Sequence, residues 1–251
     1  MASPPQRRRA ARHHTPADDP EPGRRGRSGG RRTPITVDVV VGTALGIVER
    51  EGYAALTMRR VAAVLGTGPA SLYAHVVNKE DLDDLLIGRI CADVELPAPD
   101  PHAWREQVVD VCHQLHDRYA RYPGVSLAAL ATVPTDRDTL RVSEGLLGIV
   151  LAGGVDPQTA AWAVDALLLY VNAFCLEAAL ADRRADRDGT ALDRDGLLRR
   201  LALLPDTFPH TRRHAAEVTS GTGLERFRFT LDLITNGLRD RPGDGPRANR
   251  T

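Results

Sequence analysis

The hydrophobic and polar residues follow a helical repeat along almost the whole chain after residue 34. Apolar side chains recur every three or four positions, and each run stops at the glycines and prolines that typically end helices. No segment shows the strict alternation of a strand. The pattern therefore predicts an all-α protein, with helices at 36–50, 57–65, 70–76, 78–95, 104–122, 126–131, 135–152, 157–183 and 224–239. Residues 185–196 are charged and show no such pattern, so a mobile loop is expected there.

The segment 56–82 differs from the rest because its helices are short and closely spaced. Thr57 can cap the first of them with its hydroxyl, and Gly66 permits the left-handed backbone of a tight turn. Pro69 suits the first turn of the next helix, and Asn78 can cap the helix that follows. This order predicts a helix-turn-helix.

Such a motif places its second, short helix in the major groove of DNA. Here the outward side chains of that helix are small or can donate hydrogen bonds, and Arg59 and Lys79 supply positive charge on either side. Arginine and lysine are the usual partners of phosphates, and arginine also reads guanine edges. The segment therefore favours DNA binding.

One set of residues in this segment has a characteristic order without a gap: Leu56-Thr57, Arg59, Ala62, Gly66, Ser71-Leu72-Tyr73, His75, Asn78-Lys79 and Asp81-Leu82. With this set, residues 35–95 resemble the DNA-binding domain of the TetR/AcrR family of bacterial regulators. The resemblance implies a DNA contact from the second helix for Arg59. It implies phosphate contacts for Thr57, Ser71, Tyr73 and Lys79, and base-facing positions for Pro69, Ala70, Ala74 and His75.

The remainder, 96–240, is similar to the tetracycline-repressor type of C-terminal domain in helix order and in Phe227-Arg228-Phe229 with Gly237-Leu238. Together the resemblances imply an all-helical homodimer that represses at a palindromic operator until a small molecule enters the C-terminal domain. Glu95 and Ala128 stand where tetracycline repressors carry drug- and magnesium-binding histidines. An effector other than tetracycline–magnesium is therefore expected.

The helix predicted at 157–183 is apolar nearly all round, and the one at 224–239 has two apolar faces. Such surfaces must be covered, either by a four-helix interface between two copies or by one large core. The dimer is the favoured interpretation. Any effector pocket should be lined by the helices at 104–122, 135–152 and 157–183. Its candidate residues are Cys112, Leu115, Trp162, Asp165, Tyr170 and Asn172.

Charge is distributed unevenly although the chain is neutral overall. Residues 1–34 hold nine arginines and three acidic residues, a net +6, so the remainder carries −6. With six prolines and four glycines as well, this arm is expected to be disordered. It could lie in the minor groove beside the helix-turn-helix, or it could be a solvated tail. The expected division is an arm at 1–34, a DNA-binding domain at 35–82, an effector-binding and dimerisation domain at 83–240, and a disordered tail at 241–251.

Other chemistries have little support in the sequence. The three cysteines occur singly, which argues against disulfides and zinc sites. His113 and His116 have a metal-compatible spacing, but their helical phase predicts that both face solvent. No nucleophile–base motif or cofactor motif is present. No signal peptide and no apolar run of about 20 residues were found, so the protein is expected to be cytoplasmic and not to contact a membrane.

The sequence thus predicts a ligand-responsive transcriptional regulator without enzymatic activity, a metal or a cofactor. Its expected partners are an operator in double-stranded DNA, a second copy of the chain and an unidentified small-molecule effector. Two alternatives remain open at this point. One is an all-helical small-molecule-binding protein or enzyme without specific DNA binding, and the other is a non-specific DNA-packaging protein.

Overall fold

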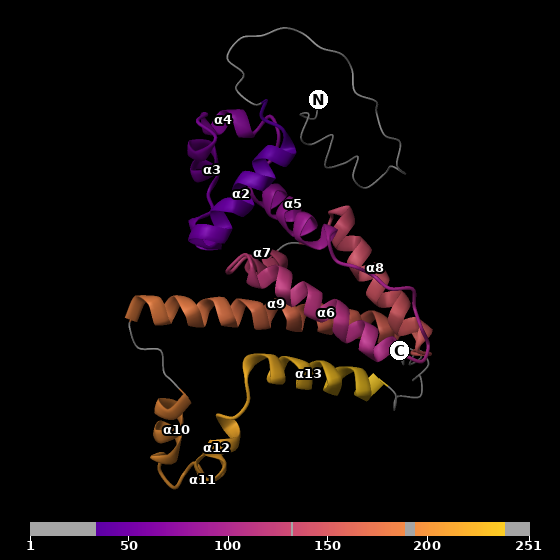
Figure 1. Cartoon of the computed structure of the whole chain (residues 1–251), viewed down its shortest axis with the longest axis vertical. Helices are drawn as coiled ribbons and strands as arrows, with labels where there is room; N and C mark the ends of the chain where they lie inside the picture. Colours follow the sequence, from indigo (N-terminus) through magenta and orange to yellow (C-terminus); the bar gives the residue numbers. More distant parts are fainter. Residues whose placement is uncertain (1–33, 132, 189–193, 239–251) are drawn as a thin grey trace, which may run out of the picture. The chain divides into compact units, whose positions relative to one another are not determined.

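The computed structural model describes residues 34–131, 133–188 and 194–238, and their regular structure is entirely helical (Figure 1). The all-α prediction is confirmed. In chain order the elements are α2 (Val37–Glu51), a 3₁₀ turn η1 (Tyr53–Ala55), α3 (Met58–Val64), α4 (Pro69–Leu72), α5 (Lys79–Ala92), α6 (Trp104–Ala120), α7 (Ser126–Ala131), α8 (Arg137–Ala152), α9 (Pro157–Asp188), α10 (Arg194–Ala202), α11 (Pro209–Arg213), α12 (Ala215–Val218) and α13 (Gly223–Gly237).

The region between the long helix α9 and the last helix contains more helix than the sequence pattern predicts. A loop was expected from residue 185 to residue 196, but α9 continues to Asp188 and α10 already begins at Arg194. The helices α10, α11 and α12 were not predicted. Arginine and alanine favour helix. An exposed helix does not need an apolar stripe, so the hydrophobic pattern of the sequence does not show it. The predicted arm up to residue 33 and the predicted tail at 241–251 lie outside the described residues.

The chain divides into two compact units. The first extends to residue 96 and includes 114–145, and the second comprises 97–113 and the part from residue 146 onward. Helices α2 to α5 and α7 belong to the first unit, whereas α9 to α13 belong to the second. The boundary expected after residue 82 falls inside α5. The assignment of DNA binding and effector binding to separate domains stays a prediction.

The core of the first unit is formed by the apolar stripes of α2 to α5. The side chains of Val40 and Val48 on α2 are fully buried, as are Val61 on α3, Leu72 on α4 and Leu82 on α5. Thr36 caps α2 as predicted, because its Oγ1 accepts a hydrogen bond from the backbone N–H of Val39 at 3.2 Å. The apolar positions that recur along the sequence therefore form the hydrophobic core of this unit.

The helix α5 is joined to the start of α8 by a buried carboxylate in the same unit. Asp84 accepts hydrogen bonds from the backbone N–H groups of Thr135 and Asp136, at 3.0 and 3.2 Å, and from the hydroxyl of Thr135. Gly88 allows this approach, because a Cβ there would lie 2.0 Å from the Asp136 carboxylate. Asp84 thus satisfies backbone donors just before α8 that would otherwise be unpaired.

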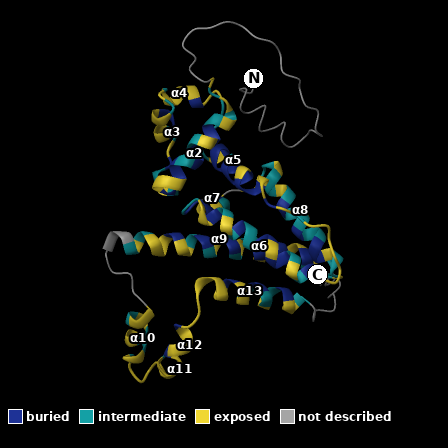
Figure 2. Cartoon of the chain, viewed as in Figure 1, coloured by how far each residue is buried: buried dark blue, intermediate teal, exposed yellow. Residues whose placement is uncertain are grey.

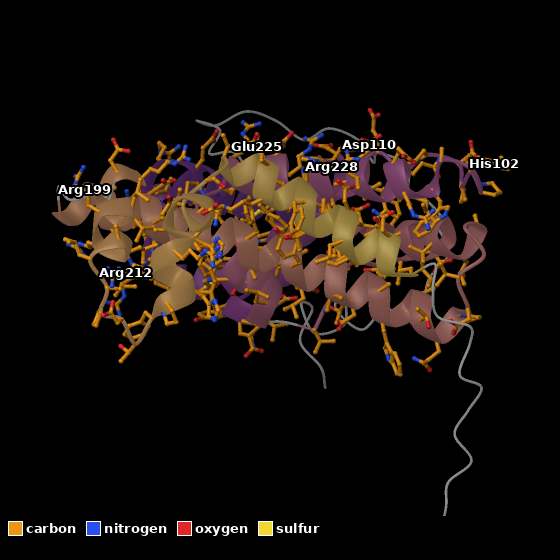
Figure 3. The ribbon with its side chains drawn as sticks, turned by 90° about the horizontal axis from the view of Figure 1, so that it is seen from below. His102, Asp110, Arg199, Arg212, Glu225 and Arg228 are labelled. Carbon is orange, nitrogen blue, oxygen red and sulfur yellow. The ribbon has the colours of Figure 1, made fainter. Side chains whose placement is uncertain are left out.

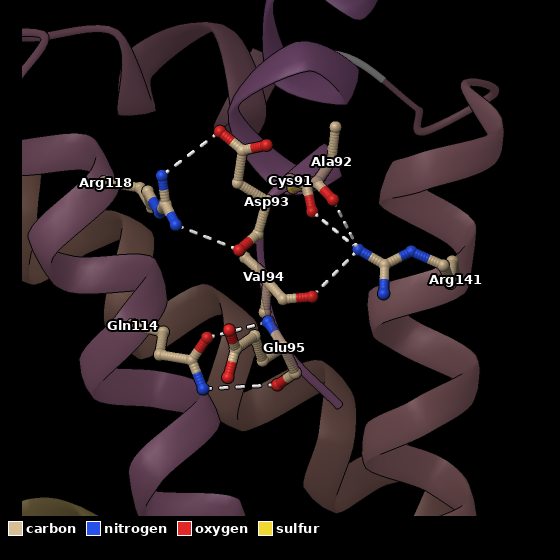
Figure 4. Close-up of polar contacts among 8 residues, drawn as sticks. All are labelled: Cys91, Ala92, Asp93, Val94, Glu95, Gln114, Arg118 and Arg141. Atoms are coloured by element: carbon tan, nitrogen blue, oxygen red, sulfur yellow. Dashed lines mark hydrogen bonds and ion pairs between the residues drawn. The ribbon is translucent and has the colours of Figure 1, made fainter. Parts of the chain in front are cut away.

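The C-terminal end of α5 is held by a guanidinium group from α8 (Figure 4). Nη2 of Arg141 donates to the carbonyl oxygens of Cys91, Ala92 and Val94 at 2.9, 3.1 and 3.0 Å. The last carbonyls of a helix lack partners within it and carry partial negative charge, so a cation is stabilising there. Arg141 therefore fixes the point at which α5 ends.

Two side chains of α6 hold the backbone of the same segment from another side (Figure 4). Arg118 donates to the backbone oxygen of Asp93 at 2.9 Å and to its carboxylate at 3.2 Å. Gln114 accepts from the N–H of Glu95 at 2.7 Å and donates to its carbonyl at 3.2 Å. Side chains from α6 and α8 thus bind the chain directly after α5.

We expect Arg141→Ala to lower the free energy of unfolding by about 3 kcal/mol, because buried carbonyls at Cys91 and Val94 would lose a charged donor. The matched change Arg118→Ala should cost less than about 1 kcal/mol, since the Asp93 carboxylate that it contacts is exposed. Urea unfolding at one fixed protein concentration measures both variants, and hydrogen exchange should rise at the end of α5 only in Arg141→Ala. Equal losses in the two variants would contradict this assignment.

In the second unit α9 packs along α13, and both helices carry exposed as well as buried residues (Figure 2). Phe227 and Leu231 of α13 are fully buried, whereas Phe229 is 68% exposed. On α9, Trp162 is 66% exposed and Leu169 is 55% exposed. By length and composition alone α9 could cross a membrane, with only a third of its apolar window buried. The exposed faces agree with the predicted surplus of apolar surface.

Several helices of the second unit also carry charged side chains (Figure 3). On α13, Arg228 forms an ion pair with Asp232 one turn later, with nitrogen–oxygen distances of 2.9 and 3.0 Å. Arg199 on α10 and Arg212 on α11 are exposed, and Arg212 pairs with Asp206. These surface pairs contribute little to stability individually.

Candidate functional site

The segment expected to form a helix-turn-helix has that local structure. Oγ1 of Thr57 accepts a hydrogen bond from the N–H of Arg60 at 3.0 Å and so caps α3. Gly66 has a φ of 63°, the left-handed conformation that the turn requires. Pro69 is the first residue of α4. The local signals in the sequence therefore gave the correct turn.

The short helix α4 presents one apolar side to the core and small side chains to the outside. Leu72 and Val76 are fully buried, and Ala70 and Ala74 are exposed. Tyr73 is 49% exposed. The N–H of Val76 donates to the carbonyl of Leu72 at 2.9 Å, so one helical turn continues beyond the last residue of α4.

The two arginines of α3 differ in their surroundings. Arg60 forms a two-pronged hydrogen bond with the carboxylate of Glu51, with distances of 2.7 and 3.1 Å, which holds its guanidinium against α2. Arg59 is exposed, and in the described part of the chain no acidic side chain pairs with it. Arg59 is therefore the arginine of α3 whose charge is available to a partner.

Lys79, predicted to contact phosphate, is engaged within the unit. Its Nζ donates to the hydroxyl of Tyr53 at 2.9 Å, forms an ion pair with Asp83, and lies 4.3 Å from the centre of the Tyr53 ring. Burial raises the pKa of Tyr53 above its usual value, and the Asp83 charge adds to this shift. The phenol is thus neutral at physiological pH. A phosphate contact would require Lys79 to share its ammonium group.

The remaining predicted DNA contacts lie on the same segment. Oγ of Ser71 accepts a hydrogen bond from the hydroxyl of Thr67 at 2.9 Å, and His75 is half-buried. Asn78 caps α5 by accepting from the N–H of Asp81 at 2.8 Å. Sequence reasoning did not find Thr67, although a hydroxyl four residues before Ser71, across the turn, was visible in the sequence.

The residues proposed for effector contact occupy different environments. Cys112 and Leu115 are buried, Trp162 and Asp165 are exposed on α9, and Asn172 is half-buried. Burial raises the pKa of Cys112 to about 12, so its thiol is unreactive near neutral pH. These placements do not bring the candidates together into one group.

Tyr170, by contrast, belongs to an aromatic cluster in the second unit. Its ring stacks on Phe227 of α13 with centroids 5.6 Å apart, and Phe174 lies 4.9 Å from Phe227. The hydroxyl of Tyr170 donates to the carbonyl of Arg226 at 3.3 Å. The sequence placed Tyr170 and Phe174 on one helix but could not show that α13 supplies the third ring.

The prediction that His113 faces solvent was wrong. Its ring packs edge-on against Phe227 with centroids 5.2 Å apart, and it is half-buried. His116 is also half-buried and lies 3.0 Å from the carboxylate of Asp117. The error arose because α6 is covered on more than one side. In the described residues, no group of three or more His, Cys, Asp or Glu side chains is placed to hold a metal ion.

Two family models match this chain. Residues 41–83 match the model described as bacterial regulatory proteins, tetR family, and residues 96–241 match the tetracyclin repressor-like C-terminal domain. The chain belongs to the TetR family. The first match covers the helix-turn-helix, and the second covers more than half of the chain.

Similar proteins are found in two Streptomyces species. The HTH-type transcriptional repressor DrrR1 of Streptomyces coeruleorubidus is 29% identical over 220 residues, which cover 84% of this chain and 80% of that protein. The TetR family protein ActR of Streptomyces coelicolor has been solved in complex with (S)-DNPA and with actinorhodin. These structures are 35% and 36% identical to this chain, each with a TM-score of 0.73, and cover 82% of it and 98% and 96% of ActR.

This membership fixes the kind of function. Members of the TetR family are transcriptional regulators, and this chain is a ligand-responsive DNA-binding regulator that acts as a homodimer. The exposed apolar faces of α9 and α13 are consistent with a second copy covering them. The alternative of one large protomer core does not account for side chains such as Trp162 and Phe229, which the protomer leaves exposed.

Proposed function

We propose that this regulator is a repressor that binds a palindromic operator and is released from it by an aromatic effector held in the second unit. The observation that carries the DNA part is the exposed surface of α3 and α4, with Arg59 unpaired among the described residues. The effector part is supported by the cluster around Phe227. The names of DrrR1, a repressor, and of the ActR complexes agree with both parts.

The proposed DNA contacts follow from the arrangement of the helix-turn-helix. Its second helix enters the major groove, and the preceding helix lies across the backbone. Arg59 contacts a phosphate or a guanine edge, and Ser71 and Tyr73 donate to phosphate oxygens. Thr57 and Lys79 contact phosphates of the DNA backbone at the two ends of the motif. Pro69, Ala70, Ala74 and His75 face the bases.

The aromatic cluster is the part of the second unit best suited to hold an effector. The half-buried rings of Tyr170 and Phe174 lie against the buried Phe227, and His113 adds an imidazole that can donate or accept a hydrogen bond. A planar aromatic molecule can stack on such rings, and each aromatic pair contributes about 0.5–1.5 kcal/mol beyond its buried area. Of the six residues predicted for the effector site, this proposal keeps Tyr170 as the central one.

The experiment begins with a duplex that covers the region upstream of this gene, monitored by fluorescence anisotropy at a stated salt concentration. The full-length homodimer should bind it with a footprint of two symmetric half-sites. Actinorhodin and (S)-DNPA serve as the effector probes, and at least one should dissociate the complex. If the duplex is not bound specifically, the regulatory function as proposed is wrong. If it is bound and neither probe releases it, the aromatic effector is wrong.

We expect Phe174→Leu to raise the effector concentration needed for half-release by roughly 3- to 10-fold, because one aromatic contact is lost while most of the volume remains. The matched control is Phe208→Leu, since Phe208 precedes α11 and is half exposed. Both variants should bind the operator with unchanged affinity. An equal shift in the two variants would show that the cluster is not the effector site.

A regulator of this kind acts where the chromosome is, so we place the protein in the cytoplasm. Fractionation of cells that express a tagged copy tests this placement. Recovery in the membrane fraction after a high-salt wash would instead indicate that the exposed apolar face of α9 contacts lipid.

A further inference from the structure

The outward edge of α4 consists of methyl groups. At about 100° per residue, Ala70 and Ala74 lie opposite the buried pair Leu72 and Val76. Both alanines are exposed. The hydrogen bond from the N–H of Val76 to the carbonyl of Leu72 continues the helical turn past the last residue of α4. The side of α4 opposite its buried pair is thus apolar.

The start of α4 has the same character. The residues at the N-terminal end of a recognition helix are those that contact base edges. Here the cap position is Gly68, which has no side chain, and the first helical residue is Pro69, which has no N–H group. Val64, near the end of α3, is 45% exposed. None of these residues can donate a side-chain hydrogen bond.

The residues that usually read bases by paired hydrogen bonds do not occur on this helix. Arginine and lysine read guanine, and asparagine and glutamine read adenine. Residues 69–77 contain none of these four types. The polar side chains Ser71 and Tyr73 lie on the two flanks of the helix, roughly 60° to 100° from the alanines, where phosphates would be met.

One base carries an apolar group in the major groove, namely the 5-methyl group of thymine, and alanine side chains contact it favourably. We propose that Ala70 and Ala74, with Pro69 beside them, determine operator specificity by contacting thymine methyl groups in each half-site. This inference rests on the proposed function, because it requires α4 to enter the major groove. It goes further by naming the base and the chemical group that are read.

The test starts by selecting tight-binding duplexes from a randomised double-stranded library with the full-length protein. Thymines that recur in both half-sites are then replaced by uracil, which keeps the hydrogen-bonding edge and removes only the methyl group. Burying one methyl group contributes about fourfold in affinity. One uracil should therefore weaken binding about fourfold, and the symmetric pair in the two half-sites roughly fifteenfold.

A second set of duplexes separates the methyl group from the rest of the base. At the same position cytosine should bind weakly, and 5-methylcytosine should recover part of the lost affinity, because it restores the methyl group. The protein side is tested with Ala70→Gly, compared on thymine and uracil duplexes. In that variant the loss caused by uracil should fall from about fourfold toward onefold, and the comparison cancels any general effect of glycine on the helix.

The outcomes are distinguishable. A specific half-site that loses affinity with uracil, with the loss reduced in Ala70→Gly, supports the inference. A specific half-site that binds equally well with uracil at every thymine overturns the inference and leaves the regulatory function intact. If no sequence is enriched at all, specific DNA binding fails and the inference fails with it.

Discussion

Arg59→Ala should weaken operator binding by at least roughly 30-fold. A lost arginine contact to a base or phosphate costs about 1–3 kcal/mol, and a homodimer loses it in both half-sites. The loss should appear without any change in helix content, because Arg59 is exposed and forms no ion pair within the described residues. Anisotropy titrations at two salt concentrations measure it and separate a phosphate contact from a guanine contact. A phosphate contact would also reduce the salt dependence of binding.

The matched control for this variant is Arg60→Ala on the neighbouring residue. Arg60 is bound to Glu51, with a shortest distance of 2.7 Å, and such an exposed ion pair contributes little to stability. Because Arg60 is held by Glu51 and is not expected to contact DNA, its replacement should change DNA affinity by less than about threefold. This is well below the cost of a direct contact. If Arg60→Ala weakened binding more than Arg59→Ala, the assignment of the two arginines would have to be reversed.

Phe227→Ala should lower the free energy of unfolding by about 3–5 kcal/mol, which is the usual cost of removing a fully buried aromatic side chain. Phe227 has no exposed surface, and its ring contacts those of His113, Tyr170 and Phe174. The variant therefore removes the centre of the cluster that connects α6, α9 and α13 in the second unit. Thermal or urea unfolding monitored by circular dichroism measures the loss.

Phe229→Ala provides the comparison within the same helix. Phe229 is mostly exposed in the protomer and lies on the face that we expect the second copy to cover. Its replacement should weaken dimerisation, so the change in apparent stability should depend on protein concentration. The effect of Phe227→Ala should persist at every concentration. If the two variants behaved alike in a dilution series, the division between core face and dimer face would be incorrect.

The local architecture of the DNA-binding segment could be predicted from the sequence because its signals act over a few residues. A threonine cap, a turn glycine with positive φ and a proline at the start of a helix each depend on near neighbours only, and all three were placed correctly. The same reasoning failed at the end of α9 and at α10 to α12. Charged, exposed helix produces no apolar stripe, so the pattern contained no signal to find.

Side-chain partners that are distant in sequence could not be predicted. Lys79 was expected to be available for phosphate, yet Tyr53, 26 residues earlier, accepts one of its hydrogen bonds. His113 was expected to face water, yet it packs on Phe227. Neither the helical phase of His113 nor the position of Lys79 at the start of its helix says which distant residues pack against it.

By itself the sequence therefore determined that this protein is all-helical, where its helix-turn-helix lies, and which side chains α4 turns outward. Caps, turns and apolar periodicity are properties of short segments, so they can be recognised without knowledge of the rest of the chain. Only the tertiary structure decided that Arg59 and not Arg60 is available, that Arg141 holds the end of α5, and that Phe227 is the centre of an aromatic cluster. Those facts depend on which helices pack together, and the packing is set by the whole chain.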